Sequence, residues 1–406
     1  MRSRTKRILA SLLATLVIVA AYGGYCLLRP VKLLASINSS QSIVKTAASK
    51  IAWPSVGQSA VGIVGNPGVV THGTQVPAPT ASVAKLITAL VVLKAKPLLV
   101  SQQGPLITLT AADVAIYGQY LNEQGSVVPV AAGEAISEYQ MLEAMLLPSA
   151  NNMADSLAVW SYGSLAAYAE AANAFLAHEG LSQTHVGVDA SGYDPTTTST
   201  AHDLVLLGEL ALQNPIVSGI VSQPSVTGIP LTTTVKNVNS LLGTDGIIGI
   251  KTGNTNQAGG VFVSASQIVV NNKTVTIVTS LATAPTLPLA LKDSVPFIAS
   301  THGNFQSQNV VQAGTVVGSY SLPWGGTAPV VATEDLNVTA WNDSPLNVSV
   351  SLQPIAATAS TGAQVGTISA GQSPLLSSQG VGLRLEGPVT QPGVWWRLKH
   401  PFSSNW

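Results

Sequence analysis

Three short groups of residues in this chain could together perform acyl transfer on a serine. The first is Ser82-Val83-Ala84-Lys85, which begins a stretch whose apolar residues have helical spacing. Residues three apart on a helix share one face, with Cβ atoms ~5–6 Å apart, so Lys85 can reach the Ser82 hydroxyl. A serine hydroxyl is a weak nucleophile until a base accepts its proton. A lysine can accept that proton when burial or a nearby positive charge favours the neutral amine.

The second group is Ser149-Ala150-Asn151, directly after Pro148. Because proline breaks the preceding helix, we expect this group in an exposed turn between two helices. A hydroxyl there can relay a proton to a leaving amine, and a carboxamide can hold a substrate amide or orient Lys85. Considered alone, Ser149 is more simply interpreted as the cap of the helix that comes after it.

The third group is Lys251-Thr252-Gly253, between a β-type run and a glycine-rich turn. On an edge strand, the lysine and the threonine hydroxyl can bind a substrate carboxylate. A glycine, which has no side chain, lets an extended peptide lie along that strand. Each group is weak evidence alone, but the three follow one another in a fixed order, which chance rarely produces.

The segments PTASVAKLITAL, MLLPSANNMADSLA and GIIGIKTGNTNQAGG resemble the three motif regions of low-molecular-mass D-alanyl-D-alanine carboxypeptidases. These enzymes are penicillin-binding serine peptidases. The segment LSQTHVGVDASGYDP, followed by STAHDL, is similar to the family's connection between the second and third motifs. The resemblance covers roughly residues 50–300 and, more loosely, the C-terminal region. It implies a peptidoglycan stem peptide ending in D-Ala-D-Ala as substrate, β-lactam antibiotics as covalent inhibitors, and no cofactor or metal.

The resemblance also implies a role for each motif residue. Ser82 would be the acylated nucleophile and Lys85 its proton acceptor, while Ser149 and Asn151 would form the proton-relay and positioning pair. The substrate-binding residues would be Lys251, Thr252, Gly253, Asn254 and Thr255.

In this scheme Lys251 and Thr252 face the substrate carboxylate, and the backbone N–H groups of Ser82 and Asn254 form the oxyanion hole. Many relatives carry an arginine soon after the strand that follows the third motif. Here TIVTSLATAPTLPLALKDS has none, and Lys292 is its only cation. Carboxylate binding is therefore expected to depend on Lys251, Thr252 and Thr255.

Other functions fit the sequence less well than a carboxypeptidase does. A β-lactamase shares the nucleophile, but class A enzymes need a glutamate-bound water, and Glu170 and Glu179 lie in an Ala-rich helix without such a loop. A DD-endopeptidase shares all three motifs and stays open. A non-catalytic wall-binding or penicillin-sensing protein would be expected to have lost at least one motif residue. The scattered histidines indicate neither a zinc peptidase nor a Ser-His-Asp hydrolase.

The N-terminal segment predicts that these motifs lie outside the cytoplasm. Ile8–Leu28 is an uncharged run of 21 residues after a basic start, and ~20 apolar residues suffice to cross a bilayer as a helix. Residues 1–28 are therefore predicted to be a membrane anchor, with a cleaved signal segment as the alternative. The protein is expected on the extracytoplasmic face of the cell membrane, or secreted if residues 1–28 are removed.

Changes in composition divide residues 29–406 into four parts. Short strand-like runs flank an Ala- and Leu-rich helical middle, which predicts an α+β domain: an antiparallel sheet plus a helical cluster, of the β-lactamase/DD-peptidase-like type. Beyond it, Val-, Thr- and Gly-rich runs predict a small all-β sandwich that acts as a spacer. The predicted parts are a linker or stalk over 29–50, the catalytic domain over 51–305, the β-sandwich over 306–393 and a Trp-rich tail over 394–406.

Two features of composition exclude other functions. Eighteen basic and eighteen acidic residues cancel, and no basic stripe is present, so nucleic-acid binding is not expected. Cys26 is the only cysteine, which excludes an internal disulfide and a cysteine metal cage. For the tail, whose tryptophans lie beside Arg397 and Lys399, a membrane-interface segment and a terminal strand packed on the sandwich are both left open.

Overall fold

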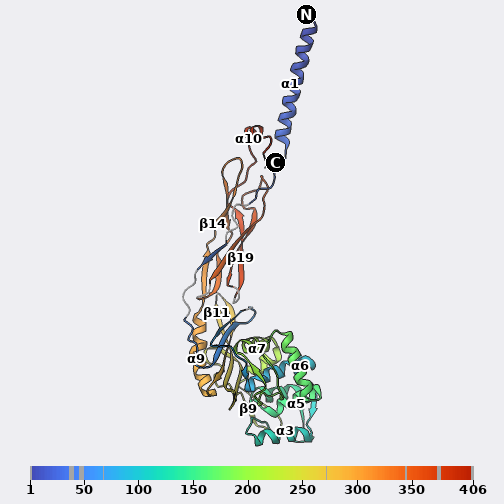
Figure 1. The fold of residues 1–406 in the computed structure, drawn as a ribbon, viewed down its shortest axis with the longest axis vertical. Coiled ribbons are helices and arrows are strands. Elements are labelled where there is room, and N and C mark those ends of the chain that lie inside the picture. The colour runs from blue at the N-terminus through green and yellow to red at the C-terminus, as the bar shows by residue number, and fades with distance from the viewer. Residues whose placement is uncertain are drawn as a thin grey trace.

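The computed structural model describes residues 2–35, 41–44, 50–66, 68–270, 272–342, 345–372 and 376–403. These residues form an elongated molecule (Figure 1). A mixed cluster of helices and sheet lies at one end, a β-rich part lies in the middle, and a long helix extends from the other end. The predicted order of an α+β part followed by a β-rich part is confirmed.

The α+β part is built on a five-stranded antiparallel sheet with the strand order β10-β11-β12-β2-β3. Two of its strands come from before the helical region and three from after it, as the sequence predicted. The strands are β2 (Gln58–Ile63), β3 (Val69–His72), β10 (Ile247–Thr255), β11 (Gly259–Val270) and β12 (Lys273–Ala284). β10, which contains the third motif, is therefore an edge strand.

Helices cover both faces of this sheet because its strands alternate apolar side chains between the two faces. Val61 and Ile277 pack against Phe297 on one face, whereas Ala60 and Val278 join the helical core on the other. The helices are α2 (Ala84–Ala95), α3 (Ala111–Asn122), α4 (Glu138–Leu146), α5 (Asn151–Tyr162), α6 (Leu165–His178), α7 (Ala201–Gln213), α8 (Pro215–Val221) and α9 (Leu287–Gly303). Short elements join them: β4 (Ala78–Pro79), η1 (Ala81–Val83), β5 (Leu106–Thr108), β6 (Ala135–Ser137), β7 (Thr198–Ser199), β8 (Ser225–Thr227), β9 (Thr234–Lys236) and η2 (Thr244–Gly246).

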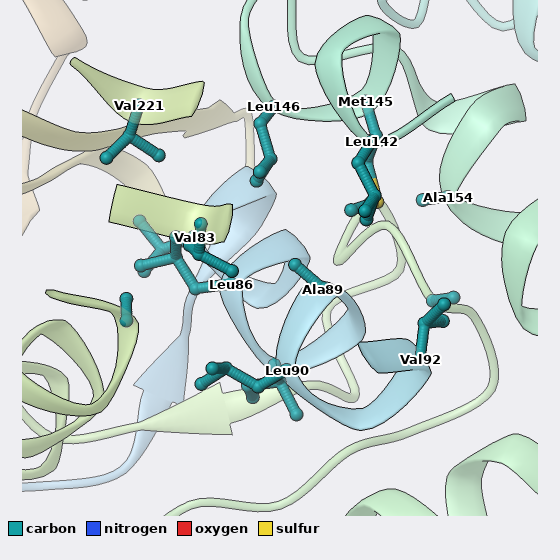
Figure 2. Close-up of a cluster of buried hydrophobic side chains, with 14 of the residues drawn as sticks. Val83, Leu86, Ala89, Leu90, Val92, Leu142, Met145, Leu146, Ala154 and Val221 are labelled. Carbon is teal, nitrogen blue, oxygen red and sulfur yellow. The ribbon is translucent and has the colours of Figure 1, made fainter. Parts of the chain in front are cut away.

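Helix α2, which begins just after Ser82, is the centre of the helical core. Its residues from Ala84 to Leu93 are all buried, as expected of a helix that is apolar on every side. Figure 2 shows Leu86, Ala89 and Leu90 of this helix among side chains such as Leu142 and Val221 from other elements. Packing on all sides therefore fixes α2, and with it the position of Lys85.

One predicted helix differs at its start. The expected helix over 135–147 begins only at Glu138, because residues 135–137 form β6 and pair with β5. Ser137 caps α4: its Oγ accepts the Gln140 N–H, and the Gln140 side chain accepts the Ser137 N–H. A capping box of this kind fixes where a helix begins.

The β-rich part has two layers. A six-stranded sheet has the order β1-β17-β18-β19-β15-β14, and the pair β13–β16 packs against it through Val338, Ile368 and Leu383. The strands are β1 (Gln41–Val44), β13 (Phe305–Val311), β14 (Val316–Ser321), β15 (Thr327–Ala332), β16 (Leu336–Trp341), β17 (Leu346–Leu352), β18 (Gln364–Gln372) and β19 (Leu376–Leu385).

The segment expected to be a polar stalk differs from that expectation. Gln41–Val44 forms strand β1, which pairs antiparallel with β17 at the edge of the C-terminal sheet. Leu34 is buried in the same apolar core and bridges to Ile355. The open edge of β17 explains the difference, because an unpaired strand edge readily accepts another strand. Residues 36–40 and 45–49 lie outside the described part of the chain.

The C-terminal end of the N-terminal helix lies beside the C-terminal tail (Figure 1). The N-terminal run forms helix α1 (Arg2–Leu28), which is long and apolar enough to cross a membrane. The tail forms the short helix α10 (Val394–Lys399) beside the end of α1, rather than a strand (Figure 1). The Arg397 guanidinium donates to the carbonyl oxygens of Leu27 and Arg29 at 3.0 and 2.9 Å. Trp396 packs on Trp324.

Candidate active site

Ser82 lies in the short 3-10 helix η1, which leads into α2, and its side chain is half-buried. Lys85 lies one turn later, and its side chain is completely buried. Its Nζ is 2.8 Å from Ser82 Oγ. The predicted proximity of these two side chains is therefore present, and the fixed position of α2 in the core maintains it.

Lys85 Nζ has two further partners, both rigid acceptors. It donates to Asn151 Oδ1 at 2.7 Å and to the Ser191 carbonyl oxygen at 3.0 Å. A neutral amine has two N–H groups and one lone pair. When those N–H groups bind the two acceptors, the lone pair is directed at the Ser82 hydroxyl. Lys85 is thereby oriented as a base toward Ser82.

Burial also adjusts the protonation of Lys85. Burial lowers its pKa from 10.5 to about 7, although the nearby Asp189 and Asp155 carboxylates act in the opposite direction. Loss of hydration destabilises an ammonium more than an amine. A substantial fraction of Lys85 is consequently neutral near neutral pH, as a general base requires.

The second motif is buried rather than exposed, so the expectation of an exposed turn was wrong. Ser149 and Asn151 are only 5% and 2% exposed. Ser149 is also not the helix cap, because α5 begins at Asn151 with Ala150 as its N-cap. Ser149 has a φ of 68°, in the left-handed region that few non-glycine residues adopt. This backbone conformation accompanies a side chain that reaches into the site instead of capping α5.

The third motif brings a second buried lysine to the same place. Lys251 Nζ donates to Ser149 Oγ at 2.9 Å and to the Thr252 carbonyl oxygen at 3.0 Å. Burial and the charge of Lys85 lower the pKa of Lys251 well below its usual value. Lys251 therefore contacts the second motif directly.

Strand β10 passes very close to Ser82. A Cβ atom on Gly253 would lie 2.7 Å from the Thr80 carbonyl oxygen and 3.3 Å from the Ser82 amide nitrogen. Only glycine allows this approach. The strand edge and the start of α2 thus lie side by side, with the Ser82 amide near the chain at Gly253.

A cavity of about 270 Å³ is lined by residues of all three motifs. The predicted residues in its lining are Ser82, Ser149, Asn151, Thr252, Asn254 and Thr255. Lys85 and Lys251 lie behind its wall, bonded to Ser82 and Ser149 respectively. Lys292, the only cation in the segment where relatives carry arginine, lies on α9 and does not line this cavity.

Sequence reasoning missed part of the lining. Gln124, Ser126, Tyr193, Val238 and Leu287 also line the cavity, and the Ser191 carbonyl binds Lys85. The segment LSQTHVGVDASGYDP contains Ser191 and Tyr193. Its similarity to the family could therefore have indicated that these two residues belong to the site. Residues 124–126 lie in a loop of ordinary composition, and no sequence signal pointed to them.

Fold and site together have the arrangement of a serine acyl-transfer enzyme, with a buried lysine in hydrogen-bond contact with the serine. The sequence model of the D-alanyl-D-alanine carboxypeptidase family matches residues 58–282, which is more than half of the chain. The chain therefore belongs to the D-alanyl-D-alanine carboxypeptidase family of serine peptidases, as its motifs predicted.

Curated relatives agree with this assignment, and a solved structure shares the fold. A D-alanyl-D-alanine carboxypeptidase, DacB2, from Mycobacterium tuberculosis is 34% identical over 198 residues, which cover 46% of this chain and 62% of the relative. The D-alanyl-D-alanine endopeptidase of Escherichia coli is 30% identical over 256 residues, which cover 61% of this chain and 78% of the relative. Penicillin-binding protein 5 from Haemophilus influenzae shares the fold with a TM-score of 0.59 at 17% identity, over 85% of this chain and 99% of that one.

Proposed function

We propose that this protein removes the terminal D-alanine from peptidoglycan stem peptides that end in D-Ala-D-Ala, through an acyl-enzyme on Ser82. The observation that carries the proposal is the 2.8 Å contact between Lys85 Nζ and Ser82 Oγ, with the other two partners of Lys85 fixed. Family membership supplies the substrate class. β-Lactam antibiotics would acylate the same serine.

In the first half of the reaction, Lys85 accepts the Ser82 hydroxyl proton as Oγ bonds to the carbonyl carbon of the penultimate D-alanine. The Ser82 and Asn254 N–H groups would hold the resulting oxyanion, and two such donors contribute several kcal/mol. The C–N bond then breaks, and the proton that Lys85 took from Ser82 passes through the Ser149 hydroxyl to the leaving amine, so Lys85 is neutral again. Lys251, which contacts Ser149 at 2.9 Å, would orient that hydroxyl. D-Alanine departs and the acyl group remains on Ser82.

In the second half, water attacks the acyl carbon while Lys85 accepts a proton from it. The bond between the acyl carbon and Ser82 Oγ then breaks, and Lys85 returns the proton to that oxygen. Among the described residues that line the Ser82 cavity, none is an aspartate or a glutamate. Glu170 lies exposed on α6. A class A β-lactamase needs a glutamate to activate the deacylating water, so the site favours a peptidase that penicillin inhibits over an enzyme that destroys penicillin.

Release of D-alanine from a peptide ending in D-Ala-D-Ala tests this function. We expect one D-alanine per peptide from the detergent-solubilised chain and none from Ser82→Ala. The variant Ser182→Ala, which changes an exposed serine, is the matched control and should behave as the parent does. Release that survives in Ser82→Ala would rule out the assigned nucleophile. Covalent labelling by a fluorescent penicillin should follow the same pattern and separates this enzyme from a non-catalytic wall-binding protein.

The second candidate function is cleavage of peptide cross-links. It is favoured by the 30% identity with the Escherichia coli endopeptidase. A cross-linked muropeptide dimer offered beside the pentapeptide distinguishes the two activities. Cleavage of the dimer without release of D-alanine from the pentapeptide would make this protein an endopeptidase.

We further infer that α1 remains attached as a membrane anchor and that the catalytic part lies outside the cytoplasm. The Arg397 guanidinium is largely buried and binds the carbonyl oxygens of Leu27 and Arg29, and the Tyr22 hydroxyl binds the Leu398 carbonyl. Cleavage after residue 28 would remove the Tyr22 and Leu27 contacts. The protein should therefore stay in washed membranes with residue 28 still present. A mature chain that begins beyond residue 28 would contradict this.

A further inference from the structure

A buried carboxylate for which no role was expected lies behind Lys85. Asp155 is on α5, one helical turn after Asn151, so both side chains share one face of that helix. It is 5% exposed. Its Oδ1 accepts the Ala190 N–H at 2.9 Å, and its Oδ2 accepts the Tyr120 hydroxyl at 2.7 Å.

These bonds connect Asp155 to Lys85 through one short stretch of backbone. Ala190 directly precedes Ser191, whose carbonyl oxygen is one of the two fixed acceptors of Lys85. Asp189 fixes the residues that follow it in the chain. Its carboxylate accepts the Ser191 hydroxyl at 2.8 Å and the backbone N–H groups of residues 192–194. Asp155 thus holds the chain that binds Lys85, and the two carboxylates together place negative charge beside it.

The ionisable groups around this pair come from several elements. The Tyr120 hydroxyl is also 3.4 Å from Asp189 Oδ2, and burial together with both carboxylates raises the pKa of Tyr120, so it remains a donor. Burial raises the pKa of Asp155 to about 6. Asp155, Tyr120 and Asp189 line a cavity of about 690 Å³ next to the Ser82 cavity, with which it shares Tyr193 and Asn254. The ionisable groups that face this region are Lys85, Lys251, Asp189, Tyr120, Tyr168, Tyr193, Glu123 and Asp194.

Building on the function proposed above, we propose that Asp155 is a positioning residue that holds the Ser191 carbonyl on Lys85 and whose charge sets the neutral fraction of that lysine. A charged Asp155 favours the ammonium form of Lys85, and a protonated Asp155 does not. As the medium becomes mildly acidic, Asp155 gains a proton and this stabilisation of the ammonium is lost. Acylation of Ser82 therefore declines less steeply below pH 7 than it would beside a permanent charge.

The variant Asp155→Asn tests the charge while it keeps the size and the oxygen that accepts the Ala190 N–H. The measurement is the rate constant for acylation of Ser82 by a fluorescent penicillin from pH 5 to 9. In the variant, the midpoint of the acid limb of the pH–rate profile should move to a pH roughly one unit lower than in the parent. The variant should therefore react faster than the parent between about pH 6 and 7.5. The two profiles should converge near pH 5, where the parent's Asp155 is protonated, and near pH 9, where Lys85 is neutral in both.

Two further variants keep the test decisive. Asp113→Asn changes another carboxylate that faces α5, where Asp113 Oδ1 accepts the Ser156 hydroxyl at 2.6 Å, and its profile should not move. Tyr120→Phe removes a bond that favours the charged form of Asp155, so its profile should move in the same direction as that of Asp155→Asn, by less. This variant also serves if Asp155→Asn does not fold.

A uniform loss of rate at every pH in Asp155→Asn, or an acid limb at the parent's position, would overturn the proposal and leave Asp155 a structural residue. An unlabelled Ser82 in the parent would instead refute the proposed function on which it rests. The two failures are therefore distinguishable.

Discussion

Lys251 Nζ lies 2.9 Å from Ser149 Oγ, although 102 positions separate the two residues in the chain. Both side chains are buried: Lys251 lies on the edge strand β10, and Ser149 lies two residues before α5. The contact joins the second and third motifs, as the contact between Lys85 and Asn151 joins the first and second. Both contacts end on residues 149–151, so this short segment connects all three motifs. A substitution in one motif should therefore also affect the positions of side chains in the other two.

Removal of the Ser149 hydroxyl should slow the release of D-alanine. Ser149 is proposed to pass a proton to the leaving amine, and a positioned acid of this kind contributes about 10²–10⁴-fold. We expect kcat in Ser149→Ala to fall by roughly 10²-fold, with a smaller change in KM, in steady-state assays of the pentapeptide.

Ser149→Gly separates the hydroxyl from the backbone at this position. Its φ of 68° suits glycine better than alanine. Ser149→Gly should thus resist urea better than Ser149→Ala while being equally slow. If it recovers activity, the loss in Ser149→Ala came from backbone strain.

Gly253→Ala should displace the nucleophile. The added methyl would meet the Thr80 carbonyl oxygen at 2.7 Å, so β10 or the turn before Ser82 must shift. We expect the free energy of unfolding to fall by about 1–3 kcal/mol and penicillin acylation to slow by roughly tenfold or more, the loss that a displaced catalytic group brings. Gly219→Ala, at an exposed position on α8 with nothing within 4 Å of the new methyl, is the matched control. Equal behaviour of the two variants would show that the close approach at Gly253 is not needed.

The stability of the α+β part should decrease as pH rises from about 4.5 to about 7. Glu138 is 1% exposed, and within the described part of the chain its carboxyl oxygens have no hydrogen-bond partner. Burial raises its pKa from 4.5 to about 7, against the opposing effect of Lys96. The folded state therefore binds this proton more tightly than the unfolded state. The contribution of this bound proton to the free energy of unfolding is complete below pH 4.5 and is lost as pH rises through 7.

Urea unfolding at pH 5 and pH 8 measures this effect. The difference in unfolding free energy between the two pH values should be smaller in Glu138→Gln than in the parent, by on the order of 1 kcal/mol. Glu170→Gln, at an exposed position on α6, should retain the parent's difference. A Glu138→Gln variant with the same pH dependence as the parent would refute this role for Glu138.

The β-rich part should be destabilised without loss of catalysis by Tyr320→Phe. The fully buried Tyr320 donates its hydroxyl to the Gln353 carbonyl oxygen at 2.5 Å. Loss of that bond leaves a buried acceptor with one partner fewer and costs on the order of 1 kcal/mol. We expect the unfolding transition of this part to shift while penicillin acylation stays unchanged. A parallel loss of acylation would contradict the expectation that the β-rich part is a spacer.

The sequence by itself was sufficient for the order of the parts and for most of the chemistry. Apolar spacing predicted the helix after Ser82, and strand-like runs at both ends of the helical middle predicted the mixed sheet of β2, β3 and β10–β12. These signals are local, because helix and strand periods can be seen in the residues of one segment. The motifs Ser82–Lys85, Ser149–Asn151 and Lys251–Gly253 were also local, and their order identified the family.

Only the tertiary structure decided what depends on neighbours distant in the chain. It buried Ser149 where a local rule predicted an exposed turn, and it paired Gln41–Val44 with β17 where composition predicted a stalk. It also placed Asp155 and the Ser191 carbonyl beside Lys85. Burial and electrostatic fields arise from packing between segments far apart in sequence. For this reason the sequence could point to Lys85 as the proposed base for Ser82, whereas burial in the folded structure lowers the pKa of that lysine.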